Sequence, residues 1–468
     1  MIFRRLLWAG LTVLIYFGAS AGAAESKIKN VLFLISDDLK ASTLGAYGDR
    51  IVETPHIDAL AKRGMIFQRG YCQGTSCGPS RRSFMRSRYW DENGKTMGEN
   101  FIENGFYSAR VGKIFHMKVP GDIIAGTNGS DVEDCWTERY NSAGLEAHTA
   151  GTYSLYNHDI ETTSMKNRMS TAQHDRWFVS VRYEGDGSDQ PDYKTASKTI
   201  ELIREHGQSD RPFFIAAGFV RPHYPNVAPQ QYFDKYPYQN IPLPETRAGD
   251  LDDVPELGHT RVTSLNDPIG KYPDNQKKFW GAYYATITYM DDQVGRIMAE
   301  LDRQGLRDST AIVFIGDHGY HLGEHFFWQK SNLHEDVTRV PFIVSAPGFE
   351  PGETDSIAEL ADLYPTLAEL VGISYPDTVQ GKSLVRVLKD ATATVREDAF
   401  TVHGPKDLAL RGDRWAYMRY KDDSEELYDM KQDPKQFTNL ARDPQFAGVL
   451  AEQRERLRAR VAAAGFND

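Results

Sequence analysis

The sequence is poor in cysteine, with only Cys72, Cys77 and Cys135 among its 468 residues. So few cysteines exclude a disulfide-rich scaffold and allow at most one disulfide bond. Cys72 and Cys135 could form that bond, and buried free thiols are the alternative. Because at least one thiol must stay unpaired, the position of each cysteine needs its own explanation.

Positive charge is also in short supply. Lys and Arg number 54 against 65 Asp and Glu, which gives a formal net charge of −11. This excess of acid disfavours non-specific binding to nucleic acid, so no nucleic-acid partner is expected. An anionic substrate would therefore need a pocket in which basic side chains are concentrated locally.

Long apolar runs are absent except at the N-terminus. There, Arg4 and Arg5 precede an apolar stretch that ends in small residues, with an A-x-A pattern from Ala21 to Ala23. This pattern is typical of a secretory signal peptide cleaved after Ala23, and an uncleaved membrane anchor is the alternative. We expect residues 1–23 to be removed and the mature protein to be secreted or periplasmic, without stable insertion in a membrane.

Short apolar runs at residues 31–36, 213–220 and 311–316 predict strands buried on both faces of a mainly parallel sheet. Residues 192–207 and 289–305 carry apolar side chains at helical spacing and precede the second and third runs. This alternation of strands and helices predicts an α/β fold with helices layered around a central sheet.

Two regions depart from the alternation. Residues 120–200 are rich in Gly, Asn, Ser and Asp and are predicted to be long loops that shape a substrate site. After about residue 375, short segments predict antiparallel strands, and a final amphipathic helix is predicted to begin at Asp443. We expect a catalytic domain over residues 24–374 and a smaller C-terminal α+β subdomain over residues 375–468.

Charged side chains follow the predicted strands at their carboxyl ends, where open α/β sheets bind ligands. They are Asp37 and Asp38, Lys113 and His116, Arg221 and His223, and Asp317 and His318. Aspartates on one rim repel one another unless a cation lies between them, and oxygen ligands suit calcium or magnesium. A metal site is therefore predicted, with a solvated loop or a helix cap as the alternative for the first pair.

Other clusters of acids and histidines have a different interpretation. Asp291 and Asp292 lie inside a helical pattern and are predicted to form a solvated face. His318, His321 and His325 have a spacing that suggests zinc on a helix, but glycines interrupt the segment. Of these three histidines, only His318 is expected to bind a metal.

Basic and imidazole groups complete the predicted site. Arg81, Lys113 and Lys330 can hold an anion with several exposed oxygens, as phosphate and sulfate have, while a metal polarises another oxygen. His116 and His223 titrate near neutral pH and can move protons. Taken singly, these residues would be surface charges or hydrogen-bonded polar groups, but their predicted convergence favours attack on a phosphate or sulfate ester.

Several motifs resemble those of one enzyme family. "CGPSR", from Cys77 to Arg81, matches the Cys-x-Pro-x-Arg motif of the type I sulfatases, and "NGFYSARVGKIFH" resembles their second signature. The resemblance runs in order from about residue 28 to residue 442, through "ISDDL", "TPHIDALAKRGMIF", "GFVRPHYP", "GDHGYHLGEH", "DLYPTLAELVGI" and "ELYDMKQDP". "VGKIFH", "VRPHYP" and "HFFWQKSN" are most similar to the iduronate-2-sulfatase-like branch. The resemblance implies an alkaline-phosphatase-like layered sandwich with a mainly parallel central sheet and a smaller C-terminal α+β subdomain.

The resemblance also implies a nucleophile and a metal. Cys77 would be oxidised by a formylglycine-generating maturase to formylglycine (3-oxoalanine), whose hydrated aldehyde acts as the nucleophile. One calcium ion, favoured over magnesium, would be held by Asp37, Asp38, Asp317, His318 and the modified Cys77.

The remaining roles concern the anion and the protons. Arg81 would stabilise the hydrated aldehyde, and Lys113 and Lys330 would bind the sulfate group. His223 and Lys330 would assist the leaving alcohol, and His116 would act as the base that expels sulfate.

The sequence departs from the family in two places. Arg86 and Ser87 stand where the family usually has a Thr-Gly pair, and His318 replaces the metal ligand that is often Asn. The expected substrate is a sulfated carbohydrate from a glycosaminoglycan or an algal polysaccharide. A phosphoester or phosphonate hydrolase of the same superfamily, and a non-catalytic glycan-binding relative that has lost maturation, are the alternatives.

Overall fold

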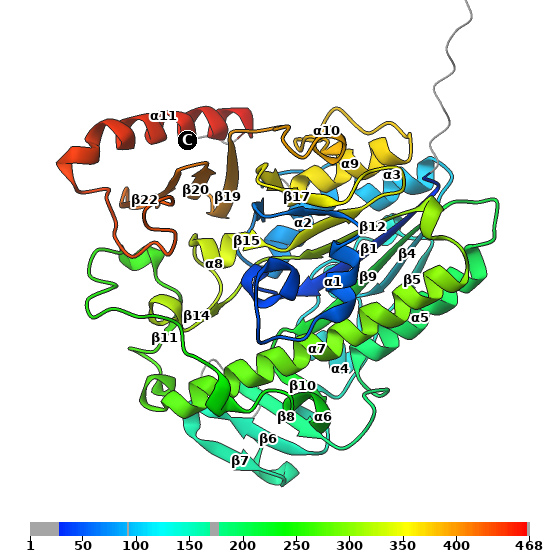
Figure 1. Ribbon diagram of the computed structural model, residues 1–468, viewed down its shortest axis with the longest axis horizontal. Coiled ribbons are helices and arrows are strands. Elements are labelled where there is room, and N and C mark those ends of the chain that lie inside the picture. Colours follow the sequence, from blue (N-terminus) through cyan, green and yellow to red (C-terminus); the bar gives the residue numbers. More distant parts are fainter. Residues whose placement is uncertain (1–27, 91–92, 169–176, 466–468) are drawn as a thin grey trace, which may run out of the picture.

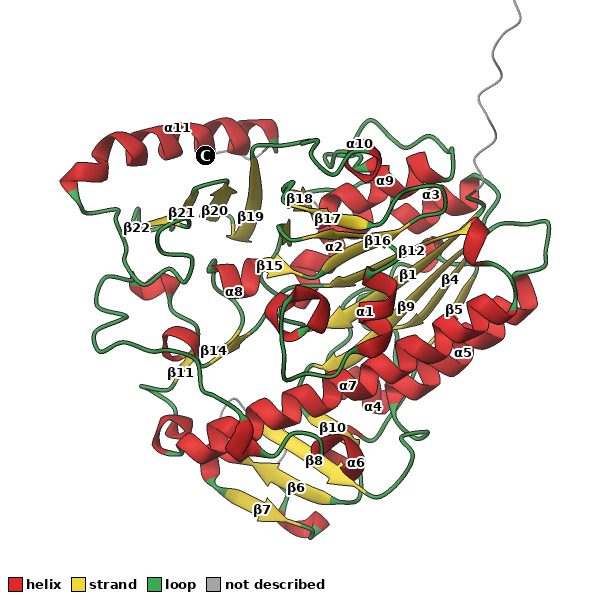
Figure 2. Cartoon of the chain, in the orientation of Figure 1, coloured by secondary structure: helices red, strands yellow, loops and turns green. Residues whose placement is uncertain are grey.

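An eight-stranded sheet runs through the middle of the molecule in the computed structural model, which describes residues 28–90, 93–168 and 177–465 (Figures 1 and 2). In spatial order the strands are β17 (Gly352–Thr354), β2 (Met65–Phe67), β16 (Phe342–Ser345), β12 (Thr310–Gly316), β1 (Asn30–Asp37), β9 (Phe213–Pro222), β4 (Tyr107–Gly112) and β5 (Glu138–Tyr140). β12, β1, β9, β4 and β5 are parallel to their neighbours in this run, whereas β16 is antiparallel to both of its neighbours. The prediction of a mainly parallel central sheet is confirmed.

The register of the parallel strands brings their carboxyl ends to one edge. Ser36 in β1 pairs with Gly316, the last residue of β12, and Asp37 pairs with Pro222, the last residue of β9. Gly112 ends β4 and pairs with Gly218 of β9. The polar residues that follow these strands in the sequence are therefore close neighbours in space.

Successive side chains along each strand point to opposite faces of the sheet. Both faces are apolar, and helices cover each of them. Leu32 and Leu34 of β1 share one core with α1 (Pro55–Ala61), α5 (Pro191–His206) and α7 (Pro273–Arg303). Phe33, on the opposite face, shares a second core with α2 (Cys77–Arg86), α3 (Met97–Glu103), α9 (Leu363–Leu370) and α10 (Val385–Lys389). All eight residues of β1 are buried, as a central strand covered on both faces requires. The layered α/β architecture is confirmed.

The middle of the chain contains a second sheet where long loops were predicted. Its order is β10 (Asn226–Pro229), β8 (Val179–Tyr183), β6 (Thr152–Leu155) and β7 (Ile160–Thr162). Residues such as Tyr153, Val179 and Val227 form its small core. These strands are three to five residues long, which is too short for an alternating pattern to be recognised among polar neighbours. The prediction of loops over this region was therefore wrong in part.

The C-terminal part of the chain forms a four-stranded antiparallel sheet. Its strands are β19 (Asp398–Gly404), β20 (Asp407–Gly412), β21 (Trp415–Arg419) and β22 (Glu425–Asp429). α11 (Ala447–Ala463) packs on this sheet through Leu450, Leu457 and Val461. Asp443 caps the short turn before α11, where its carboxylate accepts the backbone N–H of Gln445 at 2.9 Å. The predicted antiparallel strands and final helix are present.

Asp291 does not lie on a solvated face, so that prediction was wrong. Its side chain is fully buried, and its two carboxylate oxygens accept the backbone N–H groups of His56 (3.0 Å) and Ile57 (2.7 Å) at the start of α1. Asp292 remains partly exposed and accepts the Tyr232 hydroxyl at 2.6 Å. α1 packs across this side of α7, and the spacing within one helix cannot reveal such a partner.

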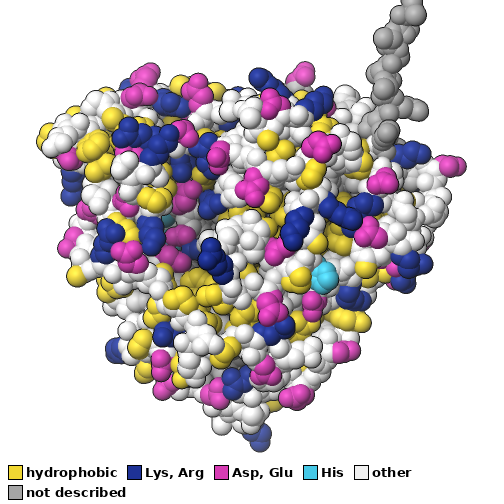
Figure 3. All heavy atoms as spheres, in the orientation of Figure 1, with side chains coloured by type: hydrophobic (Ala, Val, Ile, Leu, Met, Phe, Trp, Pro, Cys, Tyr) yellow, Lys and Arg dark blue, Asp and Glu magenta, His cyan; other side chains and the backbone are white. Residues whose placement is uncertain are grey.

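The surface shows no concentration of one charge on the visible face, where basic and acidic side chains are interspersed (Figure 3). Among the described residues, no helix combines the length and the apolar character needed to cross a membrane. The predicted signal peptide, residues 1–23, lies outside the described residues.

Candidate active site

Loops after four parallel strands supply the predicted polar residues, and the structure brings most of them together. Asp37 ends β1 and Asp38 follows it. Lys113 and His116 follow β4, His223 follows β9, and Asp317 and His318 follow β12. Cys77 and Arg81 come from the first turns of α2, which packs under the same edge. The side chains of Asp37, Asp38 and Asp317 are fully buried, so they form an enclosed polar centre rather than a solvated loop.

Cys77 is the first residue of α2, and its thiol lies at the middle of the cluster. Its Sγ is 3.1 Å from Lys330 Nζ and 3.3 Å from His318 Nε2. Burial raises the pKa of this thiol, but Lys113, Lys330, His318 and a hydrogen bond with His116 together lower the pKa well below its ordinary value. Lys330 also donates a short hydrogen bond to Asp38. The surroundings of Cys77 therefore favour an anionic group at this position.

Arg81 holds the carboxylates of Asp37 and Asp317 in place. Its Nε donates to Asp317 at 2.8 Å and its Nη2 to Asp37 at 3.3 Å, while Nη1 donates to the carbonyl oxygens of Lys113 and Ile114. Burial and Cys77 raise the pKa of Asp37, but Lys113 and Arg81 lower it by more, so this carboxyl is ionised. Burial raises the pKa of Asp317 to about 7. Arg81 and His318 oppose this rise, so the charged form of Asp317 depends on the cations around it.

The donor set fits a bound cation. Oxygen, nitrogen and sulfur atoms of Asp37, Cys77, Asp317 and His318 all lie within 4.8 Å of one another. The Nδ1 atom of His318 is 2.9 Å from the carbonyl oxygen of Gly319, which can only accept, so Nδ1 carries a proton and Nε2 faces the centre. Burial lowers the pKa of His318, but Asp317 and Cys77 raise it to about 9, so a cation at the centre would take the place of the Nε2 proton. Asp38 Oδ2 is buried without a hydrogen-bond partner. Such an orphaned carboxylate oxygen beside two other carboxylates is what an oxygen-binding cation would satisfy.

The two histidines predicted to move protons lie on the rim of this centre. His223 Nε2 is 3.6 Å from Asp38 Oδ2, its Nδ1 is 2.6 Å from the carbonyl oxygen of Tyr224, and its ring stacks on the Tyr224 ring at 4.5 Å. His116 lies beside Cys77, and its Nδ1 is buried without a hydrogen-bond partner. Both rings are therefore placed to exchange a proton with a molecule bound at Cys77.

Several residues singled out in the sequence lie elsewhere. His321 Nε2 is 3.1 Å from Asn332 Oδ1, and His325 bonds to Asp250, so neither reaches the centre. Arg221 makes a bidentate ion pair with buried Glu146, at 3.0 Å for each oxygen. Cys72 and Cys135 are buried free thiols rather than a disulfide.

Tyr283 is a contributor that sequence patterns did not indicate. It lies on α7, and its hydroxyl donates to the Asp38 carbonyl oxygen at 2.6 Å and accepts the Lys40 N–H at 3.0 Å. These bonds hold Asp38 in a left-handed backbone conformation, with φ of 61°. The ring also stacks on Tyr320, two residues beyond His318, at 5.8 Å. No local signal distinguishes this tyrosine from the others in α7.

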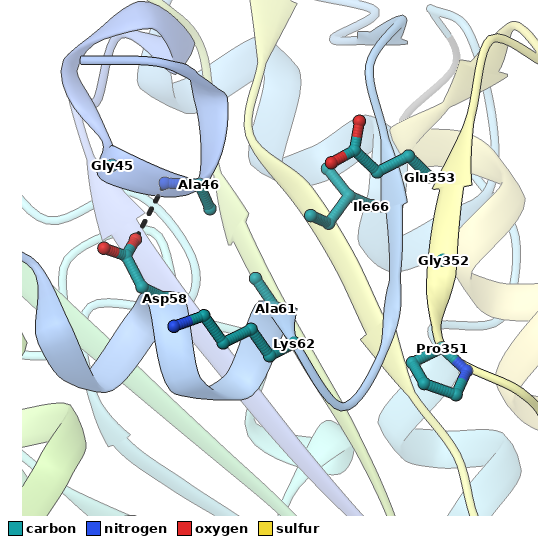
Figure 4. Close-up of a pocket in the computed structure, with 9 residues that line it drawn as sticks. All are labelled: Gly45, Ala46, Asp58, Ala61, Lys62, Ile66, Pro351, Gly352 and Glu353. Carbon is teal, nitrogen blue, oxygen red and sulfur yellow. Dashed lines mark hydrogen bonds between the residues drawn. The ribbon is translucent and has the colours of Figure 1, made fainter. Parts of the chain in front are cut away.

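A cavity of about 430 Å³ lies apart from this site, between α1 and β17 (Figure 4). Its lining includes Lys62, Ile66 and Glu353, and the carboxylate of Asp58 accepts the Ala46 N–H at 2.8 Å. None of the converging residues at the strand ends lines this cavity. The Asp58 carboxylate is used to fix the backbone at Ala46. The cavity is therefore not the candidate active site.

Comparison with known proteins assigns the chain to a family. The sulfatase family matches residues 29–373, and the C-terminal region of N-sulphoglucosamine sulphohydrolase matches residues 323–463. The chain belongs to the sulfatase family. Human iduronate 2-sulfatase is 30% identical over 473 residues, covering 86% of this chain and 82% of the human protein. This sulfatase is therefore related to the iduronate-2-sulfatase branch and is a sulfuric ester hydrolase.

Solved structures agree on the fold. A phosphonate monoester hydrolase of Agrobacterium radiobacter has a TM-score of 0.74 at 20% identity, covering 93% of this chain and 96% of its own. A structure in complex with its substrate D-glucosamine-2-N,6-O-disulfate has a TM-score of 0.72 at 19% identity, covering 94% of this chain and 99% of its own. These likenesses confirm the predicted alkaline-phosphatase-like fold. Sulfatases generally use formylglycine and a divalent metal ion, and the buried centre has a cysteine and a set of metal-binding side chains in contact.

Proposed function

We propose that this sulfatase hydrolyses sulfate esters of a carbohydrate, using formylglycine made from Cys77 and one bound calcium ion. The observation that carries the proposal is the surroundings of the Cys77 thiol, which touches Lys330 and His318 within a buried group of three aspartates. A cysteine kept for packing would lie among apolar side chains, as Cys72 does in the second core.

The proposed groups each supply one function. The hydrated aldehyde would provide an oxygen nucleophile where Sγ now lies, and calcium would neutralise Asp37, Asp38, Asp317 and polarise a sulfate oxygen. His318 Nε2 completes the set of ligands from this chain. Calcium is preferred to magnesium because carboxylates from separate loops suit its flexible coordination better than a strict octahedron, although an imidazole such as His318 is an uncommon calcium ligand.

Other side chains bind the ester and move its protons. Lys330 contacts Cys77 Sγ at 3.1 Å, Lys113 lowers the pKa of the same thiol, and both would bind the sulfate oxygens. Arg81 fixes Asp37 and Asp317 and favours the charged form of the nucleophile. His223, beside Lys330 on the rim, protonates the leaving alcohol, and His116 takes the proton whose loss releases sulfate. The net reaction consumes one water and yields the alcohol and hydrogen sulfate.

Three lines support a carbohydrate substrate and export. The human relative is named for a sulfated uronic acid, and a similar fold binds a sulfated glucosamine. The N-terminal sequence has the pattern of a signal peptide. We propose a secreted or periplasmic enzyme that encounters its glycan outside the cytoplasm, after a maturase has acted on Cys77.

Mass spectrometry of the Cys77 peptide tests the modification. When the protein is expressed together with a formylglycine-generating enzyme, the Cys77 peptide is expected to have the mass of a peptide with formylglycine in place of cysteine. Unmodified cysteine under these conditions would contradict the proposal and favour a binding protein without catalysis.

Substrate class is tested with the same preparation. Turnover of an aryl sulfate and of sulfated oligosaccharides is expected to exceed turnover of the matching aryl phosphate and aryl phosphonate. A preference for either phosphorus ester would assign the site to phosphoryl chemistry on the same fold.

A further inference from the structure

The first strand of the C-terminal sheet reaches the loop that precedes Cys77. Thr401 Oγ1 donates to the Cys72 carbonyl oxygen at 2.6 Å, and the Val402 N–H donates to the Gln73 carbonyl oxygen at 3.1 Å. Val402 also forms a parallel β-bridge with Gly74. β19 is therefore fixed against residues 72–74, and His403 is the next residue of the strand.

His403 is tied to the same loop through its side chain. Its Nδ1 is 2.5 Å from Thr75 Oγ1, and Thr75 stands two residues before Cys77. The Thr75 carbonyl oxygen accepts the N–H of Ser331 at 3.1 Å, and Ser331 follows Lys330. Thr75 thus joins His403 to both segments that flank the Cys77 thiol.

The free side of the His403 ring is suited to a ligand. The residue is half-buried, and Nδ1 is engaged by Thr75. Among the described residues no side chain or backbone group bonds to Nε2, and Nε2 is not one of the buried atoms that lack a partner, so it is open to solvent. Burial and the nearby Lys421 lower the pKa of His403, against the opposing effect of Asp407, so the ring is neutral at physiological pH. It presents one hydrogen-bonding nitrogen outwards.

The turn after His403 joins β19 to β20 and carries exposed residues. Pro405 and Lys406 connect β19 to β20 and are exposed, and Lys421 is exposed in the turn between β21 and β22. The Lys421 N–H is fixed by the Asp407 carboxylate at 2.8 Å. Exposed ammonium groups therefore lie in the turns next to His403.

We propose that His403 is a specificity-determining residue. Its Nε2 would form a hydrogen bond with a hydroxyl group on the sugar ring that carries the sulfate ester. The assignment rests on the proposed function, because it takes the sulfate to be bound between Lys113 and Lys330. A sugar attached to that sulfate must leave the pocket past its rim, and His403 is joined to the rim through Thr75. A small aryl sulfate has no sugar hydroxyl groups and would not form this hydrogen bond.

The test compares two substrates in His403→Ala. With sulfated disaccharides prepared from heparin and from carrageenan, kcat/KM is expected to fall about tenfold on the better substrate, the value of one hydrogen bond to a polar group. The loss is expected mainly in KM. With an aryl sulfate, kcat/KM is expected to stay within about twofold. His403→Gln retains a polar group at the position of Nε2 and is expected to recover part of the loss on the sugar only.

Matched measurements separate the possible roles of His403. His206→Ala removes another half-buried histidine, on α5, and is expected to change neither substrate. An equal loss on aryl sulfate and sugar would show that His403 acts only by supporting the Thr75 loop, and no loss on either would show that it does not contact substrate. Both results overturn the assignment.

Binding separates this proposal from the proposed function. Calorimetry in a Cys77→Ala background measures affinity for the same disaccharides without turnover, and His403→Ala is expected to weaken it about tenfold. Absence of turnover in the parent enzyme would contradict the proposed function alone. Unchanged affinity on His403→Ala, or no binding of either disaccharide, would contradict the assignment of His403.

Discussion

Tyr283→Phe is expected to weaken binding of the proposed calcium ion without changing any of its proposed ligands. The hydroxyl is the only atom removed, and the ring that stacks on Tyr320 is retained. The change leaves the Asp38 carbonyl oxygen and the Lys40 N–H without this partner in a buried setting, because Tyr283 is 1% exposed. Each unpaired buried group costs about 1–3 kcal/mol, so the ordered loop is destabilised by about 2–4 kcal/mol after partial relaxation.

The loss is expected to divide between two readouts. The melting temperature of the metal-free protein falls because the buried groups are part of the fold. The calcium dissociation constant rises about tenfold if about 1.4 kcal/mol of the loss falls on ordering Asp38 for the metal. Thermal unfolding with calcium and with chelator, together with calorimetric titration of calcium, measures both.

Tyr284→Phe is the matched control for this experiment. It removes a hydroxyl from the next residue of α7, whose partner is the Asp49 carboxylate at 2.9 Å. It is expected to lower stability and to leave the calcium dissociation constant unchanged. If Tyr283→Phe behaved in the same way, the hydroxyl would be structural only, and its role in positioning Asp38 would be refuted.

Three further outcomes are expected. Cys77→Ala should abolish sulfatase turnover while the circular dichroism spectrum and melting temperature stay near the parent values; unfolding would instead indicate a structural cysteine. Treatment with a chelator should reduce activity, with recovery on adding calcium, and full activity in metal-free enzyme would exclude the metal site. Asp291→Ala should lower the free energy of unfolding by about 2–4 kcal/mol in urea, because it unpairs two backbone N–H groups at the start of α1; a change below about 0.5 kcal/mol would mean that water replaces the carboxylate.

The main features of the fold and site could be predicted because they depend on local pattern. Buried strands are continuous apolar runs, and parallel strands deliver the residues after them to one edge, so Asp37, Asp317 and His223 could be expected together. Partners from other elements could not be predicted this way. Asp291 looked solvated because its spacing within α7 reports the helix alone, and Tyr283 and His403 act through contacts with loops that are distant in the sequence.

Ser87 shows how a departure from a family motif can be compensated by contacts that the motif does not contain. It ends α2 in the left-handed conformation, with φ of 54°, where the glycine usual in the family is free of strain. Its buried hydroxyl donates to the Ala361 carbonyl oxygen at 2.6 Å and accepts the Gly381 N–H at 2.9 Å. The serine thereby ties the helix that begins with Cys77 to two other segments.

Restoring the family's residue is therefore expected to be harmful. Ser87→Gly relieves about 1 kcal/mol of backbone strain. It also unpairs two buried groups at about 1–3 kcal/mol each, so the free energy of unfolding should fall by about 1–5 kcal/mol. Urea denaturation measures the change, and Ser83→Gly, in the same helix but without this backbone conformation, reports the cost of glycine alone. A more stable Ser87→Gly protein would show that strain outweighs the two hydrogen bonds, and that Ser87 is a tolerated defect rather than a compensated substitution.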